Sequence, residues 1–477
     1  MGFFENFVNK AAKSIDKVIG LKDPMSPGKL ERSITPGYEY PQGTKRVGRC
    51  NNVDATWVII PEGATSIDDK AFQNCEALTK LYIPDGVTKI GAGAFDCCSG
   101  LTEIRIPDSV TEIGKYAFNG CSSLSKIRIP DGVSMIGDGV FQGCESLTQV
   151  EIQNGVTEIC QFAFDGCSSL TSIQLPEGIT SIANQAFRGC SSLTEIQIPE
   201  GVTKIGVRVF EGCKSLKQIM IPNGVTHIEY QTFRDCASLA VIQIPTSVTE
   251  IESYAFQGCV SLTQILIPEG VTKIEDHAFY YCSGLTQIQI PNSVTKIGCY
   301  AFQRCSSLTK IRIPDSVTSI EDHAFYYCTS LQQIHIPNSV TKIGPGAFES
   351  CVNLRQITIP NCMTKIEDDS FVGCSCLTEI KIPESVTEIG YCAFANCNNI
   401  NVIIPTNNIS IALCAFDGIM GLHFMQGVNG VKFEDEFFYH SSLQSCTIMA
   451  PFGGDKEKIS DFKKHFKSVI DTDTDTI

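Results

Sequence analysis

The sequence contains no apolar run that approaches the ~18 residues required by a membrane-spanning helix. Its first twenty residues, MGFFENFVNKAAKSIDKVIG, lack the continuous apolar stretch of a secretory signal peptide, because charged and amide side chains interrupt them early. Asn6 stands where the myristoylation motif requires Ser or Thr, and the C-terminal residues form no obvious anchor or sorting signal. We therefore expect a cytoplasmic protein. Arrival at the cell surface or secretion by a non-classical route is the alternative.

Motifs that carry catalysis are equally scarce. The sequence has no phosphate-binding loop, no nucleophile elbow and no pair of cysteines at the C-x2-C spacing of structural zinc sites. We expect no catalytic residue, no metal and no cofactor, and we predict that the protein is not an enzyme. An enzyme with an unrecognised site in a terminal segment is a competing hypothesis.

Basic residues are too few to balance the acidic ones. The chain has 37 Lys and Arg against 52 Asp and Glu, which gives a net charge of -15. The first fifty residues are basic, so the remainder is more acidic than the whole. An acidic surface repels phosphate backbones, and we therefore expect no nucleic-acid partner.

A strict internal period dominates what is present. Four residue types recur every 23 positions: proline from Pro61 to Pro383 with Gln153 in the one gap, phenylalanine from Phe72 to Phe394, cysteine from Cys75 to Cys397, and leucine from Leu78 to Leu377. No insertion or deletion interrupts the span. This period indicates a stack of similar coils, a solenoid, in place of the roughly three globular domains that the length would suggest.

One unit, residues 101–123, reads LTEIRIPDSVTEIGKYAFNGCSS. Ile104 and Ile106 alternate with Arg105, the period-two pattern of a strand, and the proline that follows ends it. Val110 begins a second inward-facing stretch, for which we predict another short strand, and Phe118 belongs to the return segment. We predict an α/β repeat protein that is mostly β, in which eighteen such strands form one long parallel sheet.

The two ends of the chain differ from the repeats, as a solenoid needs its ends covered. We predict an amphipathic helix over 1–20, a linker over 21–50, the solenoid over 51–451, a capping segment over 452–470 and a disordered tail over 471–477. The capping helix is expected to run from Lys456 to Ile470. Residues 3–19 share an apolar face, so contact with a membrane is an alternative to capping for that helix.

The unit resembles the BspA-like leucine-rich repeats, as IPDSVTEIGKYAFNGCSSLSKIRIP at residues 106–130 illustrates. Its first half also fits the leucine-rich pattern L-x-x-L-x-L-x-x-N-x-L. The resemblance covers about five-sixths of the chain and implies a leucine-rich-repeat solenoid. It further implies a surface or secreted adhesion-type protein, with no catalytic motif to carry over. The missing export signal and anchor are a departure from the bacterial surface members.

Fifteen of the 24 cysteines occupy one repeat position, here called the cysteine ladder (Cys75 to Cys397). Neighbouring copies would lie about one strand spacing apart, ~4.8 Å, which is within the range a disulfide needs. Apolar surroundings and the missing export signal favour reduced structural thiols instead. A zinc site among the extra C-terminal cysteines is a weaker alternative, since no histidine accompanies them.

Two polar features each have a structural and a functional interpretation. The segment IEDHAFYYC occurs twice and places His277 and His323 two coils apart; near-duplicate repeats explain it better than a shared metal site, given the ~10 Å separation. The residue after most prolines is acidic or Asn, as at Asp85, Asp108 and Asp315, which predicts an acidic ridge along one edge. Turn stabilisation explains this ridge most simply.

The outward position between the two strand isoleucines varies, whereas the core positions barely do. We call these residues the strand row: Tyr82, Arg105, Arg128, Glu151, Gln174, Gln197, Met220, Gln243, Leu266, Gln289, Arg312, His335, Thr358 and Lys381. We expect them on the concave face of the sheet, where they bind a protein partner, in adhesion or host interaction as the resemblance implies. An architectural surface protein with no single ligand is the alternative. We expect a monomer.

Overall fold

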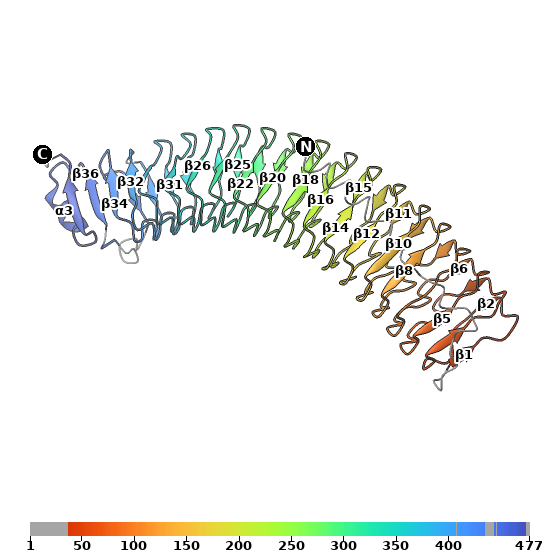
Figure 1. The fold of residues 1–477 in the computed structure, drawn as a ribbon. Coiled ribbons are helices and arrows are strands. Elements are labelled where there is room, and N and C mark those ends of the chain that lie inside the picture. The colour runs from red at the N-terminus through yellow and green to blue at the C-terminus, as the bar shows by residue number, and fades with distance from the viewer. Residues whose placement is uncertain (1–36, 407, 435–442, 445, 474–477) are drawn as a thin grey trace.

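The computed structural model of the chain describes residues 37–406, 408–434, 443–444 and 446–473. These residues form one continuous solenoid that bends into an arch (Figure 1). It is mostly β, and nearly every coil contributes one longer and one shorter strand to two parallel rows. The predicted fold class is confirmed, including the second short strand of each coil.

The longer strands stack in parallel from one end of the arch to the other. They are β1 (Gly37–Glu39), β3 (Trp57–Ile59), β5 (Lys80–Tyr82), β8 (Lys126–Ile129), β10 (Gln149–Ile152), β12 (Ser172–Gln174), β14 (Glu195–Gln197), β16 (Gln218–Met220), β18 (Val241–Gln243), β20 (Gln264–Leu266), β22 (Gln287–Gln289), β24 (Lys310–Arg312), β26 (Gln333–His335), β28 (Gln356–Ile357), β30 (Glu379–Lys381), β32 (Asn401–Ile404), β34 (Gly421–Phe424), β36 (Thr447–Ala450) and β37 (Ser468–Asp471). The coil between β5 and β8 joins the row through a single bridge, Glu103 to Lys126.

The shorter strands form the second row. They are β2 (Arg46–Val47), β4 (Ser66–Ile67), β6 (Lys89–Ile90), β7 (Glu112–Ile113), β9 (Met135–Ile136), β11 (Glu158–Ile159), β13 (Ser181–Ile182), β15 (Lys204–Ile205), β17 (His227–Ile228), β19 (Glu250–Ile251), β21 (Lys273–Ile274), β23 (Lys296–Ile297), β25 (Ser319–Ile320), β27 (Lys342–Ile343), β29 (Lys365–Ile366), β31 (Glu388–Ile389), β33 (Ser410–Ile411) and β35 (Lys432–Phe433).

The core is a set of columns in which like side chains meet like. The phenylalanines from Phe72 to Phe416 are fully buried and stack face to face, with ring centroids 5.2–5.9 Å apart. The strand isoleucines, the repeat leucines and the cysteine ladder form parallel columns beside them. The same residue type therefore recurs every 23 positions in the core because each core side chain stacks on its equivalent in the next coil.

In the coils that the structure describes, the return segment is a hydrogen-bonded ladder without helix. In one coil, the amides of Tyr254, Phe256 and Gly258 donate to carbonyl oxygens of the next coil, at 3.1, 2.9 and 2.8 Å. The residues between them donate within their own coil, and two positions per coil, such as Tyr254 (φ 61°), are left-handed. Glycine fills the second of these positions in many coils, as at Gly258 (φ 73°), because it adopts this conformation without strain.

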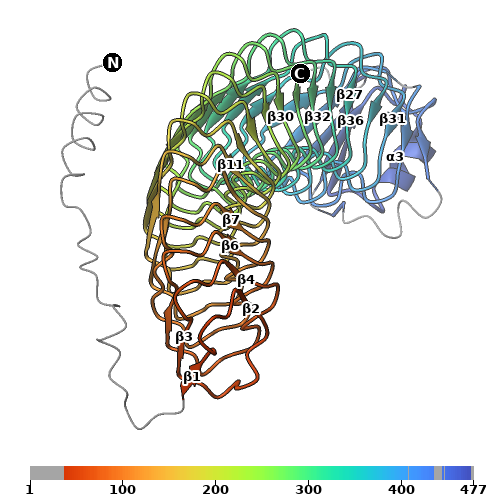
Figure 2. The same cartoon turned by 90° about the vertical axis from the view of Figure 1, so that its right-hand side faces the viewer.

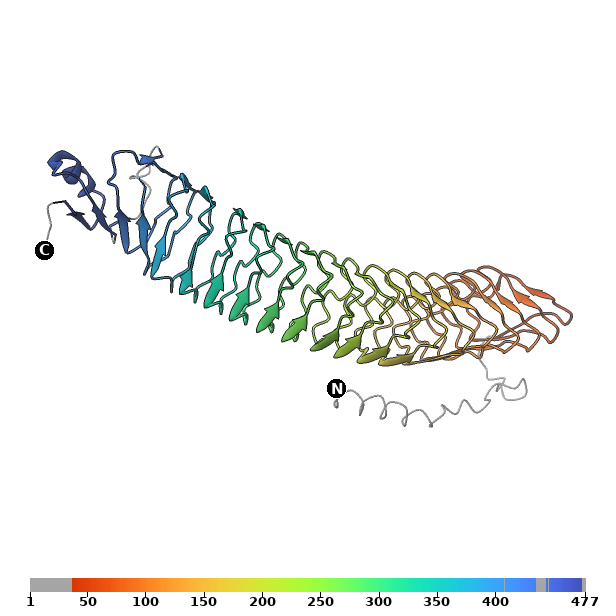
Figure 3. The same ribbon diagram turned by 90° about the horizontal axis from the view of Figure 1, so that it is seen from above.

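The longer strands lie along one flank of the arch and not inside its curve (Figures 1 and 3). The expected concave position for the strand row is therefore corrected to this flank, which we call the strand face. The reason lies in the return ladder: both the strands and the return segment are joined to the next coil by backbone hydrogen bonds. Both sides thus rise by about one strand spacing, ~4.8 Å per coil, and nothing wedges the stack open opposite the strands.

The solenoid begins within the expected linker. Strands β1, β2, β3 and β4 lie together at the N-terminal end of the solenoid (Figure 2). Strand β1 pairs in parallel with β3, β2 pairs with β4, and Tyr40 and Cys50 are buried in the core. Residues 37–50 are thus a coil, in which Pro41 takes the place of Pro61. Its spacing of 20 residues, not 23, hides it from the period. The helix predicted over 1–20, with the membrane contact of 3–19, lies outside the described residues.

The C-terminal cap contains a shorter helix than predicted. Helix α3 spans Lys456–Phe462, with Asp455 as its N-cap, and the chain then forms β37 on the open edge of β36. Val469 and Ile470 therefore belong to a strand, because an exposed edge needs partners and β-branched residues suit it. The first residues of the expected disordered tail are ordered. Asp471 is buried, and its carboxylate accepts hydrogen bonds from the backbone amides of Phe452 and Gly454. Residues 474–477 lie outside the described part.

Within the described residues, no helix has the length and apolar character needed to cross a membrane.

Candidate interaction surface

The strand row occupies the strand face as the alternation predicts. All of its side chains point outward and are exposed, except for the half-buried Tyr82, Arg128 and Glu151. The parallel register places each residue of the strand row beside the equivalent residue of the next coil. For example, Leu266 lies beside Gln289, and Gln289 lies beside Arg312. The residue two positions earlier in each strand also points outward, so two rows share this face.

At the N-terminal end, the strand row is already partnered within the chain. Tyr82 Oη donates to Glu62 at 2.9 Å, and the guanidinium of Arg105 binds Asp85 at 3.1 Å. Arg128 binds Asp108 in the same way. Burial and the Glu62 carboxylate raise the pKa of Tyr82 to about 12. The acidic ridge thus neutralises Arg105 and Arg128, two of the cations that the sequence predicts as binding residues.

In the middle of the array, the strand face exposes three large apolar side chains on consecutive coils. Met220 is 48% exposed, Val241 47% and Leu266 70%. Val241 belongs to the second outward row, which the sequence reading did not single out. The alternation in SLAVIQIP, where Val stands at a position that is polar in most coils, is the signal that could have revealed it.

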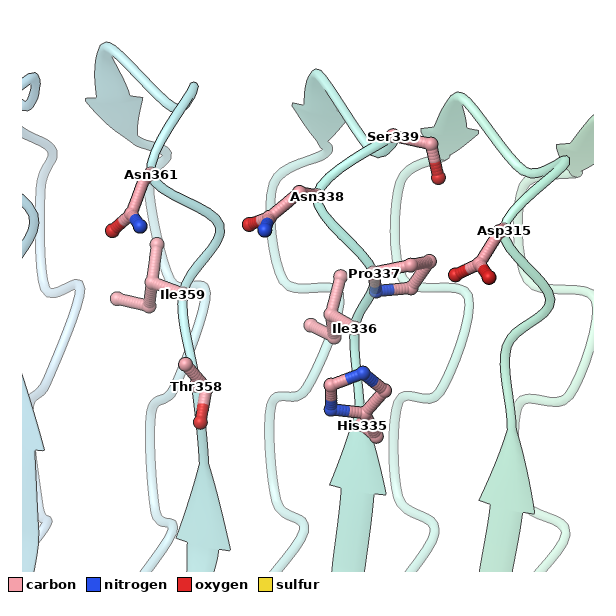
Figure 4. Close-up of a pocket in the computed structure, with 9 residues that line it drawn as sticks. All are labelled: Asp315, His335, Ile336, Pro337, Asn338, Ser339, Thr358, Ile359 and Asn361. Carbon is pink, nitrogen blue, oxygen red and sulfur yellow. The ribbon is translucent and has the colours of Figure 1, made fainter.

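Further along, a polar hollow opens at the ends of neighbouring strands (Figure 4). His335 and Thr358 line it from the strand row, Asp315 from the acidic ridge, and Asn338 and Asn361 from the turns after Pro337 and Pro360. The side chains come from three consecutive coils and carry one carboxylate, one imidazole and two amides. This composition suits hydrogen bonding to a polar partner surface.

The return segment carries a feature that sequence reasoning missed, the aromatic ladder of Tyr254, His277, Tyr300 and His323. Their rings stack with centroids 4.4, 4.8 and 4.9 Å apart. The guanidinium of Arg304 lies 5.6 Å from the ring of the neighbouring Tyr327. All four ladder residues fall two positions before the repeat phenylalanine, and reading that column down the array would have found them.

The duplicated IEDHAFYYC segments meet in this ladder. The Tyr300 ring separates His277 from His323, so the two imidazoles do not share a site. Burial lowers the pKa of His277, against the opposing effect of Asp276. Among the described residues, no group of three or more His, Cys, Asp or Glu side chains is arranged to hold a metal ion.

The cysteine ladder has a backbone partner. From Cys98 to Cys397, each ladder Sγ donates to a phenylalanine carbonyl of the preceding coil at 3.0–3.3 Å, for example Cys121 to Phe95 and Cys351 to Phe325. Every described cysteine is a free thiol. Burial raises the pKa of Cys282 and Cys351 to about 12, which suppresses the reactive thiolate.

We therefore predict selective alkylation of the native protein. N-ethylmaleimide should modify the exposed Cys362 at least ~100-fold faster than any ladder thiol, because only thiolates at the surface react. Peptide mapping by mass spectrometry over a time course measures the rates. Half-buried Cys160 and Cys299 should react at intermediate rates. Equal labelling rates for Cys362 and Cys259 would contradict the structural role of the ladder.

Comparison with known proteins agrees with this architecture. The family model "BspA type Leucine rich repeat region (6 copies)" matches residues 49–170, 157–286, 249–374 and 341–453. The chain belongs to this BspA-type leucine-rich-repeat family. The repeat positions on which the sequence resemblance rests form the buried core columns. The outward positions of the strand face are the ones that differ from coil to coil.

Solved structures of leucine-rich repeat proteins are similar to it. A leucine-rich repeat protein from Bacteroides ovatus is 32% identical, with a TM-score of 0.61, over 73% of this chain and 87% of that one. A leucine-rich cell surface protein from Faecalibacterium prausnitzii is 26% identical, with a TM-score of 0.32, over 83% and 86%. Comparison with curated proteins gave no match.

Proposed function

We propose that this BspA-type solenoid is a non-enzymatic protein-interaction scaffold whose partner binds the strand face. The observation that carries the proposal is the exposure of Met220, Val241 and Leu266 on consecutive coils of the strand face. Exposed apolar side chains of this size, surrounded by polar residues, mark interaction sites. The core columns are constrained by stacking, so the outward rows are where selection for a partner can act.

The surrounding residues support the same surface. The strand face around these three side chains is rich in glutamine, including Gln218, Gln243, Gln264 and Gln289. Glutamine amides both donate and accept hydrogen bonds without the desolvation cost of a charge. An apolar centre with a neutral polar rim is the usual anatomy of a protein interface.

Site-specific photocrosslinking, in the producing cells alone and after they are mixed with host cells, tests the proposal. A benzoylphenylalanine placed at Gln243 or Gln289 should form adducts with a partner protein, whereas one at Gln257 or Gln303, which lie on the return segment, should not. Adducts only from the return segment, or from none of the four positions, would contradict the strand face as the binding surface. The latter outcome would favour an architectural role.

A second variant keeps the result specific. Leu266→Asp should reduce the strand-face adduct at least ~10-fold, because it places a charge where an apolar contact is expected. Circular dichroism should stay unchanged, since Leu266 is exposed. The identity of the adduct shows whether the partner is a host surface protein, as in adhesion, or a protein of the same cell.

A further inference from the structure

The part of the strand face that begins at Leu266 combines this apolar side chain with two cations. Strands β20, β22 and β24 form a shallow hollow that is lined by Leu266, Gln287, Gln289, Lys310 and Arg312. Register places Leu266, Gln289 and Arg312 in one line across the three coils, and Gln264, Gln287 and Lys310 in the parallel line. Leu266 thus stands two coil steps, ~10 Å, from Arg312.

The two cations have no ion-pair partner within the described part of the chain. Arg105 and Arg128 occupy the same repeat position as Arg312, and each binds an acidic-ridge residue 20 positions earlier, Asp85 and Asp108. The residue 20 positions before Arg312 is Asn292. An amide there cannot neutralise the guanidinium, so Arg312 keeps its charge for an external group.

Lys310 adds to this local positive charge on a chain whose net charge is -15. It lies beside Arg312 on the same strand, with Ile311 buried between them, and both side chains are exposed. Two uncompensated cations on a predominantly acidic surface form a local attractive site for a carboxylate.

We propose that this hollow binds an extended acidic peptide segment in which an apolar residue precedes a carboxylate by three positions. An extended chain rises ~3.3 Å per residue, so positions i and i+3 are ~10 Å apart, the distance from Leu266 to Arg312. The apolar residue packs on Leu266, the carboxylate binds Arg312 and Lys310, and Gln287 and Gln289 hydrogen-bond the peptide backbone between them. This inference rests on the proposed function, because it assigns partner chemistry to the strand face.

Fluorescence polarisation with labelled eight-residue peptides and the full chain tests the proposal. The probe is Gly-Ser-Leu-Gln-Ser-Glu-Gly-Ser, and the controls replace its Glu by Gln or its Leu by Ser. We expect saturable binding of the probe, at least ~5-fold weaker binding of each control, and loss of salt dependence for the Gln control. Equal binding of all three peptides, or none of the probe, would overturn it.

Protein variants locate the site. Arg312→Gln should weaken probe binding by about fivefold, and Asn292→Asp should do so equally, because it supplies the missing internal partner without altering the hollow. Arg105→Gln is the matched control and should leave binding unchanged, since Asp85 already occupies that guanidinium. Insensitivity to both Arg312→Gln and Asn292→Asp refutes the assignment, as does full competition by equimolar inorganic phosphate, which would reveal a simple anion site.

The two proposals fail separately. Peptide binding can be lost while photocrosslinks from Gln243 persist, which leaves the strand face as the interface and removes only this subsite. Conversely, a hollow that binds the probe in a protein without strand-face adducts retains the peptide chemistry and refutes the scaffold proposal.

Discussion

Replacing Phe256 by alanine is expected to lower the free energy of unfolding by about 3–5 kcal/mol. The ring is fully buried and stacks on Phe233 at 5.5 Å and on Phe279 at 5.4 Å. Its removal leaves a void that the neighbours cannot fill, because their backbones are fixed by the return ladder. The loss therefore includes both the transfer free energy of the ring and the cost of a cavity.

Guanidinium unfolding followed by circular dichroism measures this effect, and hydrogen exchange shows where it acts. A long repeat array can lose cooperativity, so exchange should accelerate first in the coils that carry Phe233, Phe256 and Phe279. Phe256→Leu, which keeps most of the volume, should cost less than about 1.5 kcal/mol. Tyr281→Ala, at a 45% exposed ring one coil away, is the surface control and should change stability by no more than about 0.5 kcal/mol.

The columns that this experiment targets could be predicted from the sequence because stacking imposes the same residue on every coil. The ring of Phe118 stacks on its copies at Phe95 and Phe141, so the 23-residue period reports the contact directly. The alternation around Arg105 placed the strand row outward for the same reason. The fold and the outward side chains of the candidate site therefore follow from local patterns.

Features that depend on comparing coils, or on the shape of the whole stack, could not be predicted in this way. The flank position of the strand face results from equal hydrogen-bonded spacing on both sides of the coil, which no single unit encodes. The different status of Arg105 and Arg312 depends on residues 20 positions earlier. The coil at 37–50 and the strand at Ser468–Asp471 break the period, and their pairing is decided by the open ends of the stack.

Two glycines at one repeat position should respond to alanine with opposite signs. Gly114 and Gly137 both follow the isoleucine of a short strand, and neither has a positive φ. A Cβ at Gly114 would lie 2.4 Å from the backbone nitrogen of Ala92, whereas at Gly137 the nearest atom would be 3.6 Å away. Only the first glycine is required by a close backbone approach.

The cause is an interruption in the row of short strands. The amide of Gly114 donates to Ile90 at 2.8 Å and holds its coil against the preceding one. Strand β7 ends the sheet that begins with β2, and β9 starts the next sheet, so no short-strand pairing joins the coil of Gly137 to the coil before it. The interrupted pairing leaves room for a methyl group at Gly137.

Gly114→Ala should therefore destabilise the protein by about 1–3 kcal/mol, since a backbone clash cannot be relieved by a rotamer change. Gly137→Ala should stabilise it by about 0.4–1 kcal/mol, because alanine restricts the unfolded chain without straining the folded one. The midpoints of guanidinium unfolding, compared between each variant and the unmodified protein, give the sign of each stability change. Shifts of the same sign would mean that the short strands continue unbroken past β7, and that each glycine reflects the repeat alone.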